Sequence, residues 1–471
     1  MWTKNTSPVS FCNGSSRRDF LKSAGNGFGM LALASLFASS EAKADALLSP
    51  LNPKSSHHAP RAKSVIWLFM EGGPSGFDLF DPKPQLKNMV GKKIDGVTAF
   101  FGNPGGVMPS PYEFKQHGKS GMWVCDRYPH IAQCVDDIAF IRSCHCDSNS
   151  HAPAMYQMNT GSTRTGFPSA GAWTTYGLGS ENQNLPGFVV MPKQEGIKGG
   201  AQNWGSGFLP GSYQGTLFRS GRNPILNLNR SPDISDVQQR AQLDIERALN
   251  EDHLRQHPGE DDLDARIASF ELAYRMQFEA SDAVDLSKET EETKRLYGIG
   301  EKESNDYGTK LLMARRLVER GVRFIQCYPS EQWDAHDNLQ TNHDSCCGLT
   351  DKPIAGLLTD LKRRGLLDST LIIWGGEFGR LPITQKGKGR DHNPHGFLTW
   401  MAGGGVKGGI TYGETDEMGY KAVDKPVSVP DLHATILHTL GLDHKKLTYL
   451  HNGRRFRLTD VSGEVLSPIL A

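Results

Sequence analysis

Three short apolar runs recur along the chain, and polar or glycine-rich segments close each of them. They are 64–70 (SVIWLFM), 322–328 (VRFIQCY) and 370–374 (TLIIW). Unbroken apolar runs of this length are typical of strands that are buried on both faces of a parallel sheet. Between the last two runs, 354–367 places leucine and isoleucine at helical spacing. The pattern therefore predicts a strand–helix–strand unit.

Further helical patterns surround these runs. Residues 305–321 form an amphipathic pattern that Gly321 closes, while 234–252 and 263–278 predict two helices in a charge-rich stretch with almost no glycine. We interpret 235–300 as a helical insertion whose charges face solvent. The fold class predicted for 64–471 is a single α/β domain with a largely parallel central sheet flanked by helices.

The N-terminus predicts an export signal. Arg17 and Arg18 precede the apolar stretch 28–38, which is followed by the A-x-A sequence at 42–44. This pattern is typical of a twin-arginine signal over 1–44, followed by a polar linker over 45–63. The apolar stretch has only about half of the roughly 20 residues that span a bilayer. We expect an exported protein, periplasmic or extracellular, with the twin-arginine export machinery as a partner and no stable membrane span.

The charge balance and the cysteine content limit the kinds of partner and cross-link that the chain is expected to have. The 471 residues carry 52 basic and 52 acidic side chains, so the balance gives no reason to expect nucleic acid as a partner. Of the eight cysteines, Cys12 leaves with the signal. The spacing of the others does not match a zinc site, so we expect a structural disulfide or buried thiols.

Acidic and imidazole side chains follow each predicted strand. Carboxyl ends of parallel strands meet at one edge of a sheet, where ligands bind. Mixed carboxylate and histidine ligands suit zinc, manganese or iron better than calcium. The alternative for each residue alone is a helix cap or a satisfied histidine. The expected cofactor is a divalent metal, with zinc, manganese and calcium kept open, and the expected ligands are Glu71, Asp334, His336, Glu377, Asp391 and His392.

The order of these motifs resembles the alkaline phosphatase superfamily, which includes sulfatases and cofactor-independent phosphoglycerate mutases. Glu71 stands where the first strand of that superfamily ends in an acidic ligand. In 370–380, Glu377 matches the aspartate of an Asp-His pair, whereas Phe378 replaces the histidine. The segment 427–442 is similar to the one that closes many sulfatases.

The whole mature chain resembles more closely a bacterial family of exported, sulfatase-like proteins catalogued as domain of unknown function 1501. The motifs that carry this resemblance are 72–84 (GGPSGFDLFDPKP), 333–336 (WDAH), 377–380 (EFGR), 390–392 (RDH) and 430–435 (PDLHAT). The resemblance implies an alkaline-phosphatase-like fold and a metal-dependent hydrolase of sulfate or phosphate esters. The expected substrate is a small-molecule or polysaccharide ester.

His151 stands where the resemblance places a nucleophile, ten residues before Gly161. The formylglycine motif C-x-P-S-R is absent from the sequence, which argues against that type of sulfatase. Three roles remain open for His151: a metal ligand or general acid with water as the attacker, a structural cap of a helix, or a covalent nucleophile. Ser150 keeps a serine nucleophile open.

Several further residues have expected roles around the ester. Arg380 and Arg390 are predicted anion clamps because guanidinium groups match tetrahedral oxyanions, with a salt bridge as the alternative for Arg390. His395 and His433 are predicted to support the ligands or to contact substrate. Asp431 is predicted to cap a helix that begins near His433. The alternative function is a non-catalytic exported binding or scaffold protein, which the His151 and Phe378 replacements favour.

Overall fold

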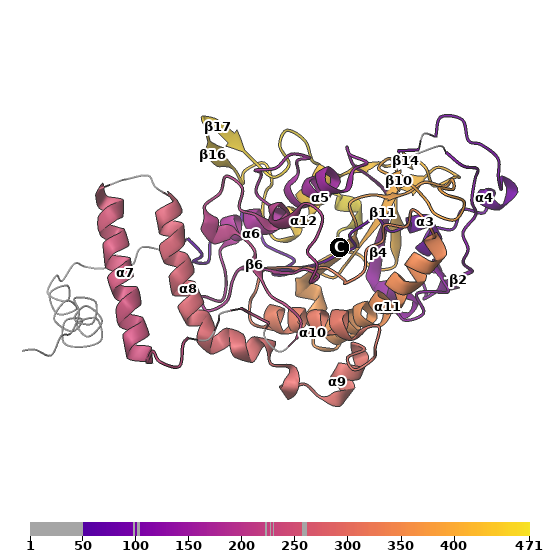
Figure 1. Cartoon of the computed structure of the whole chain (residues 1–471). Helices are drawn as coiled ribbons and strands as arrows, with labels where there is room; N and C mark the ends of the chain where they lie inside the picture. Colours follow the sequence, from indigo (N-terminus) through magenta and orange to yellow (C-terminus); the bar gives the residue numbers. More distant parts are fainter. Residues whose placement is uncertain are drawn as a thin grey trace, which may run out of the picture. The chain divides into compact units, whose positions relative to one another are not determined.

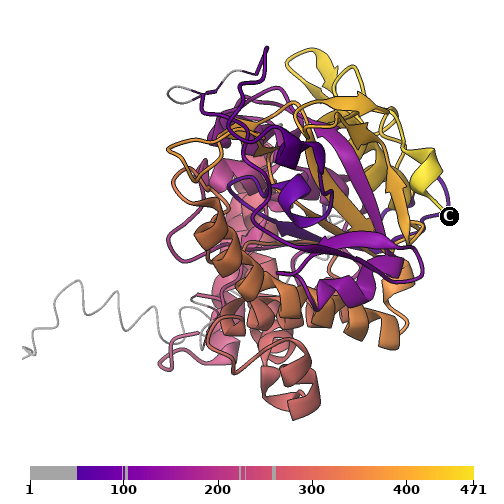
Figure 2. The same cartoon turned by 90° about the vertical axis from the view of Figure 1, so that its right-hand side faces the viewer.

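The structure is a computed structural model that describes residues 50–97, 99–100, 104–221, 224–226, 228, 230–256 and 261–471 (Figures 1 and 2). The predicted signal over 1–44 lies outside the described residues. Within the predicted linker, 50–63 is described and lies along the domain. The Lys54 amide donates to the Leu178 carbonyl at 2.8 Å, and the Arg61 amide donates to Thr439 at 2.8 Å.

The centre of the fold is a nine-stranded sheet with the order β12-β4-β11-β8-β1-β7-β5-β6, and β15 pairs with β4. All three strands that the apolar runs predicted are present: β1 (Ser64–Phe69), β7 (Phe324–Cys327) and β8 (Thr370–Gly375). β1 lies between β7 and β8 and runs parallel to both. The strand–helix–strand unit β7–α11–β8 therefore crosses over β1.

The remaining strands of this sheet were not predicted. β11 runs antiparallel to β4 and β8, whereas the other pairings in the sheet are parallel. The predicted α/β class with a largely parallel sheet is confirmed. The additional strands are β4 (Ile138–His145), β5 (Phe188–Met191), β6 (Thr216–Leu217), β11 (Phe397–Ala402), β12 (Ile410–Tyr412) and β15 (Val427–Ser428).

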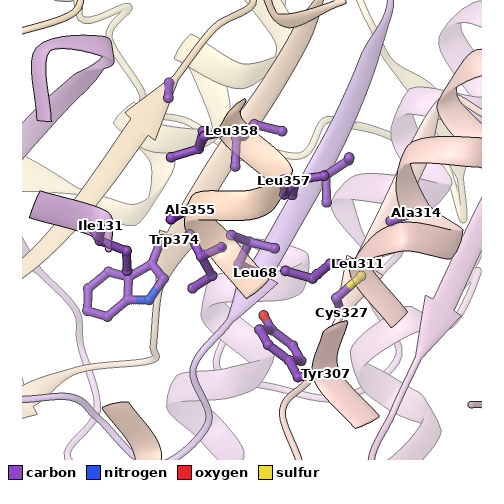
Figure 3. Close-up of a cluster of buried hydrophobic side chains, with 14 of the residues drawn as sticks. Leu68, Ile131, Tyr307, Leu311, Ala314, Cys327, Ala355, Leu357, Leu358 and Trp374 are labelled. Atoms are coloured by element: carbon purple, nitrogen blue, oxygen red, sulfur yellow. The ribbon is translucent and has the colours of Figure 1, made fainter. Parts of the chain in front are cut away.

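Helices cover both faces of the sheet, because β1 is apolar on both. Ile66 and Leu68 belong to the core beneath α10 (Asn305–Glu319) and α11 (Leu339–Arg363), which Figure 3 shows in part. Trp67 and its alternate neighbours belong to a second core on the opposite face. The helices on that face are α5 (His151–Thr160), α6 (Ala170–Leu178) and α12 (Val429–Thr439).

Several helix boundaries differ from the prediction, and the differences at α11 and α12 bear on the site. α11 begins at Leu339 rather than at 354, and it contains Pro353, whose presence and polar surroundings hid the first half of the helix. α12 begins at Val429 rather than near His433. Asp431 is the third residue of α12 and forms a capping box with Ser428, accepting its amide at 2.8 Å.

The segment predicted as a helical insertion is helical where it is described. It contains α7 (Asp236–Gln256), α8 (Asp261–Val284) and α9 (Glu291–Leu296). Residues 230–256 and 261–263 belong to a separate compact unit, in which Arg240 pairs with Asp244 one turn along α7 at 2.6 Å. Among the described residues, none of the helices has the length and apolar character that crossing a membrane requires.

Short elements complete the fold. The helices are α3 (Gly76–Leu79) and α4 (Gln85–Asn88). The small two-stranded sheets are β2 (Phe114–His117) with β3 (Met122–Cys125), β9 (Gly379–Arg380) with β10 (His392–Asn393), β13 (Glu414–Thr415) with β14 (Ala422–Asp424), and β16 (Tyr449–His451) with β17 (Arg454–Phe456).

The seven cysteines in the described part of the chain are buried free thiols. Of the two predicted alternatives, buried thiols are therefore confirmed over a disulfide for these residues. Burial raises the pKa of Cys144 to about 12, which keeps its thiol protonated and unreactive.

Candidate metal centre

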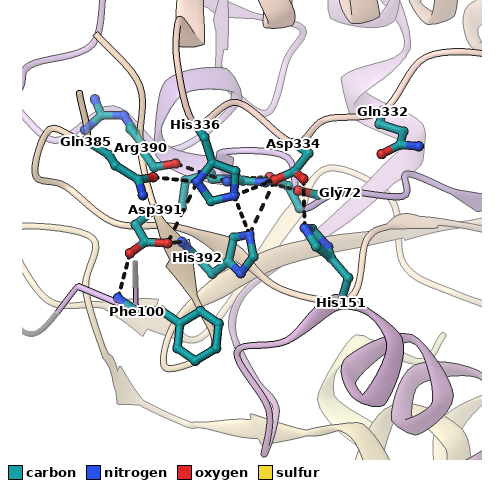
Figure 4. A network of polar contacts seen from close by, with 12 residues as sticks. Gly72, Phe100, His151, Gln332, Asp334, His336, Gln385, Arg390, Asp391 and His392 are labelled. Carbon is teal, nitrogen blue, oxygen red and sulfur yellow. Dashed lines mark hydrogen bonds and ion pairs between the residues drawn. The ribbon is translucent and has the colours of Figure 1, made fainter. Parts of the chain in front are cut away.

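Four side chains meet at the carboxyl edge of the sheet: His151, Asp334, His336 and His392 (Figure 4). One ligand atom from each lies within 4.8 Å of the others. His151 opens α5 after β4, Asp334 and His336 follow β7, and His392 lies in β10. Asp334, His336 and His392 belong to the predicted ligand set, whereas His151, which was predicted to face the ester, lies with them in the cluster.

Asp334 is the centre of this cluster. Its Oδ1 lies 2.9 Å from His336 Nε2 and 3.4 Å from His392 Nε2, and its Oδ2 lies 3.0 Å from His151 Nε2. The Nε2 atoms of His336 and His392 are 2.9 Å apart. The same nitrogen of each ring therefore points to one small region.

The other ring nitrogen of each histidine contacts an oxygen. Since these oxygens accept hydrogen bonds, each Nδ1 carries a proton, and Nε2 is the nitrogen that can release its proton and offer a lone pair to a cation. Ligating histidines are oriented in this way at protein metal sites. The acceptors are Glu377 Oε1 for His151 at 2.6 Å, Gln385 Oε1 for His336 at 2.5 Å, and the Asn149 carbonyl for His392 at 2.6 Å.

The electrostatics of the cluster keep Asp334 ionised and His392 neutral. Burial alone would raise the pKa of Asp334, but the three histidines that face its carboxylate and the charge of Arg380 hold it well below its usual range. Burial lowers the pKa of His392 to about 4. Burial also opposes protonation of His151, yet Asp334 and Glu377 outweigh it and raise the pKa of His151.

This donor set fits a divalent transition metal. Three imidazole nitrogens and one carboxylate oxygen suit zinc, manganese or iron, whereas calcium prefers oxygen ligands alone. His151 Nε2 is buried and has no hydrogen bond of good geometry, although Asp334 Oδ2 is 3.0 Å away. Burying a ring nitrogen without a hydrogen bond destabilises the folded state unless a cation coordinates that nitrogen.

Glu377 lies behind His151 and outside the four-residue cluster. It is fully buried, and its carboxylate accepts the Gly72 amide at 2.9 and 3.1 Å in addition to His151 Nδ1. Gly72 has φ +108°, and a Cβ there would lie 2.6 Å from the backbone nitrogen of Asp334. Glycine is therefore required for the β1 loop to approach the loop that carries Asp334.

Both arginines that were predicted to bind the anion are buried, and their guanidinium groups donate to oxygens of the protein. Arg380 donates to Asp334 Oδ1 at 2.8 Å and to the Gly73 carbonyl at 2.9 Å, so it fixes the carboxylate and the loop after β1. It also donates to the Gly72 carbonyl. Arg390 forms a fully buried two-point pair with Asp78, at 2.8 and 3.2 Å. The salt-bridge alternative for Arg390 is the one observed, but in the core rather than on the surface.

Glu71 and Asp391 also lie outside the four-residue cluster. Glu71 forms a buried ion pair with Lys193 at 2.8 Å and accepts the Lys198 amide at 2.8 Å. Asp391 accepts the Phe100 amide at 2.6 Å and the amide of His392, the next residue in the chain, at 2.8 Å. Both carboxylates organise the loops that border the cluster.

The other predicted residues lie apart from the cluster. Ser150 is the N-cap of α5, and its amide donates to Ser148 Oγ at 3.1 Å. His395 is exposed, and its ring lies 5.3 Å from that of Tyr420. His433 is buried and contacts the Met158 carbonyl at 2.8 Å.

Phe378, which stands where the superfamily motif has a histidine, packs against two of the clustered rings. Its ring centre lies 4.9 Å from that of His151 and 4.4 Å from that of His392. An aromatic side chain here supports the imidazoles instead of adding a ligand.

Sequence reasoning missed Lys198, whose ammonium lies 2.8 Å from Asp334 Oδ2. It also missed Gln385 and Asn149, which orient two of the histidines. The signal that points to Lys198 is the apolar run 188–191 followed by 192–200 (PKQEGIKGG). This run forms β5, which is parallel to β7, so its carboxyl end reaches the same edge of the sheet.

Comparisons with known proteins identify a family and remote structural relatives. The family described as "Protein of unknown function (DUF1501)" matches residues 62–470, and no curated protein matches the chain. The alkaline phosphatase from the Antarctic bacterium TAB5 is 12% identical, with 81% of this chain and 99% of that chain covered and a TM-score of 0.33. The PsFucS1 sulfatase from Pseudoalteromonas sp. is 13% identical, with 81% and 68% covered and a TM-score of 0.34. We draw nothing about activity from likeness at this level.

Proposed function

The chain belongs to the family described as Protein of unknown function (DUF1501), and we propose that it is a metal-dependent hydrolase of sulfate or phosphate esters. In this proposal His151, Asp334, His336 and His392 hold one divalent cation. The supporting observation is that three imidazoles from separate segments keep an oxygen on Nδ1 while Nε2 faces Asp334. Packing alone gives no reason for these nitrogens to converge, because each loses its hydration there.

A divalent cation bound by these residues lowers the pKa of a coordinated water and polarises the ester. The three imidazoles bring neutral nitrogens, and Asp334 brings one negative charge, so the site keeps a positive balance that suits an anionic ester. In the reaction, a water oxygen bonds to sulfur or phosphorus, the bond to the alcohol oxygen breaks, and the alcohol leaves with a proton.

His151 acts as a ligand in this proposal, and water takes the part of the nucleophile. Its Nδ1 is held by Glu377 and its Nε2 faces Asp334, so neither nitrogen is directed to a separate reacting atom. The hydrogen bonds that Ser150 forms with described residues involve its backbone, and no described base contacts its hydroxyl. Export by the twin-arginine route, to the periplasm or beyond, is part of the same proposal and rests on residues 1–44.

The test is metal content together with turnover. The mature protein, loaded with zinc or manganese and freed of excess metal, is expected to retain about one ion per chain, measured by elemental analysis. It is then expected to hydrolyse members of a panel of aryl sulfates and aryl phosphates. His336→Ala should lose both properties, since it removes one ligand.

His395→Ala is the matched control, because His395 is an exposed histidine of the same region that lies outside the cluster. This variant should keep wild-type metal content and turnover. A wild-type protein that retains no metal after loading would refute the proposal and favour the binding or scaffold alternative. Metal retention without turnover of either ester class would point to the same alternative with a structural ion.

A further inference from the structure

Lys198 is a cation placed beside the metal-ligand cluster. Its ammonium lies 2.8 Å from Asp334 Oδ2, the oxygen that also faces His151. About a third of the side chain, 32%, is exposed, so the ammonium borders solvent rather than the core. It differs in this respect from Arg380, which contacts the other oxygen of Asp334 and is fully buried.

A chain of hydrogen bonds, part-buried at Lys198 and buried further along, fixes the backbone of Lys198. Its amide donates to Glu71 Oε1 at 2.8 Å, and its carbonyl accepts from Asn203 Nδ2 at 3.0 Å. Asn203 is tied to Asn159 of α5 at 2.9 Å, and Asn159 is tied to Gln326 of β7 at 2.6 Å. The loop that carries Lys198 is therefore anchored to the same strand that positions Asp334.

Glu71 contributes to this anchoring from both of its oxygens. Oε2 pairs with the buried ammonium of Lys193 at 2.8 Å, and Oε1 accepts the Lys198 amide. The two lysines thus have different tasks. Lys193 neutralises a buried carboxylate, while the Lys198 side chain extends to the cluster.

With a divalent cation bound, the charges around the cluster would leave a positive excess. A divalent cation with Arg380 and Lys198 supplies four positive charges, against three negative charges from Asp334, Glu377 and Asp391. Arg380 is held by carbonyls of Gly72, Gly73 and Arg390, so it cannot turn to a ligand. Lys198 has a flexible, partly exposed side chain, which makes it the cation that is able to meet an incoming anion.

We propose that Lys198 is the substrate-binding residue that selects anionic esters, holding the charged sulfate or phosphate group between its ammonium and the cation bound by the four-residue cluster. The inference rests on the proposed function, since it needs that cation. It assigns Glu71 and Asn203 as positioning residues for Lys198.

Two affinities of a Lys198 variant test this inference: the affinity for zinc, and the affinity of the zinc-loaded protein for inorganic anions. In the full mature chain, Lys198→Met should bind zinc as tightly as wild type or up to about fivefold more tightly, because it removes a cation that competes for Asp334 at a partly exposed site. Affinity of the zinc-loaded protein for inorganic phosphate and sulfate should fall about tenfold or more, because a charged hydrogen bond is lost. Titration calorimetry measures both affinities.

Lys352→Met is the control, since Lys352 is another partly exposed lysine paired with a carboxylate, Glu301, outside the cluster. It should change neither affinity. Zinc-loaded Lys198→Met that binds both anions as tightly as wild type would overturn the inference. A parallel loss of zinc and anion affinity would also overturn it, by showing that Lys198 supports the ligands. Wild-type protein that takes up no zinc would instead refute the proposed function, and this measurement comes first.

Discussion

Replacing Glu377 with glutamine tests whether the carboxylate behind His151 sets metal affinity. Glu377 Oε1 receives His151 Nδ1 at 2.6 Å, and the two carboxylate oxygens share the Gly72 amide at 2.9 and 3.1 Å. Glutamine has the same shape, but it lacks the charge and replaces one oxygen with an amide NH2 group. If its oxygen stays on His151, this NH2 group takes the place of Oε2, 3.1 Å from the Gly72 nitrogen, and two donors then face each other in a buried site.

We expect Glu377→Gln to weaken zinc binding about tenfold to a hundredfold, which is the usual cost of losing a partner behind a ligating histidine. This corresponds to about 1.4 to 2.7 kcal/mol. The measurement is competition against a chromophoric zinc chelator at neutral pH. Glu301→Gln removes an exposed carboxylate and is the control.

A folded Glu377→Gln protein whose zinc dissociation constant stays within about threefold of wild type would refute this reasoning. It would mean that the tautomer and orientation of His151 do not depend on Glu377. Thermal unfolding in the presence of a chelator separates this result from a loss of folding, since both proteins are then compared without metal.

Three further predictions concern stability and reactivity. Asp78→Asn should destabilise the protein by about 3 to 5 kcal/mol in chemical denaturation, because it leaves Arg390 as an unpaired buried charge. An unchanged denaturation midpoint would contradict this. Asp337→Asn, which changes an exposed ion pair, is the control. Zinc at about 100 times its dissociation constant should stabilise the wild-type protein by about 2.7 kcal/mol and raise its Tm. His336→Ala should show no such rise. An equal rise in Tm in that variant would contradict the assignment of His336 as a ligand. In the mature chain the seven described thiols should react with a thiol reagent only after unfolding, so rapid labelling of the native protein would contradict their burial.

The sequence predicted the part of the fold that periodicity controls. β1, β7 and β8 are predominantly apolar runs, and α10 is an amphipathic pattern closed by glycine. β5 was missed because its apolar run, 188–191, has only four residues between Gly187 and Pro192, too few to separate a strand from a loop in the sequence. The antiparallel placement of β11 depends on its pairing with β4 and β8, which the order of apolar runs along the chain does not specify.

The candidate site was predicted in part for a similar reason. Asp334, His336 and His392 follow strands or lie close to them, and strand ends share one edge, so their convergence is readable from order along the chain. Which carboxylates face the cluster is not readable in this way. Glu71 is taken by Lys193, more than 100 residues away, and this choice depends on three-dimensional packing.

Gly72 joins the segments that build the cluster, because its N–H meets Glu377 and its carbonyl meets Arg380, which in turn holds Asp334. A ring of contacts of this kind makes the energetic effects of substitutions interdependent. Double variants within it should cost less than the sum of their single changes, since the first change already breaks what the second would break. Divergence at any one of these positions during evolution is therefore conditional on the residues present at the others.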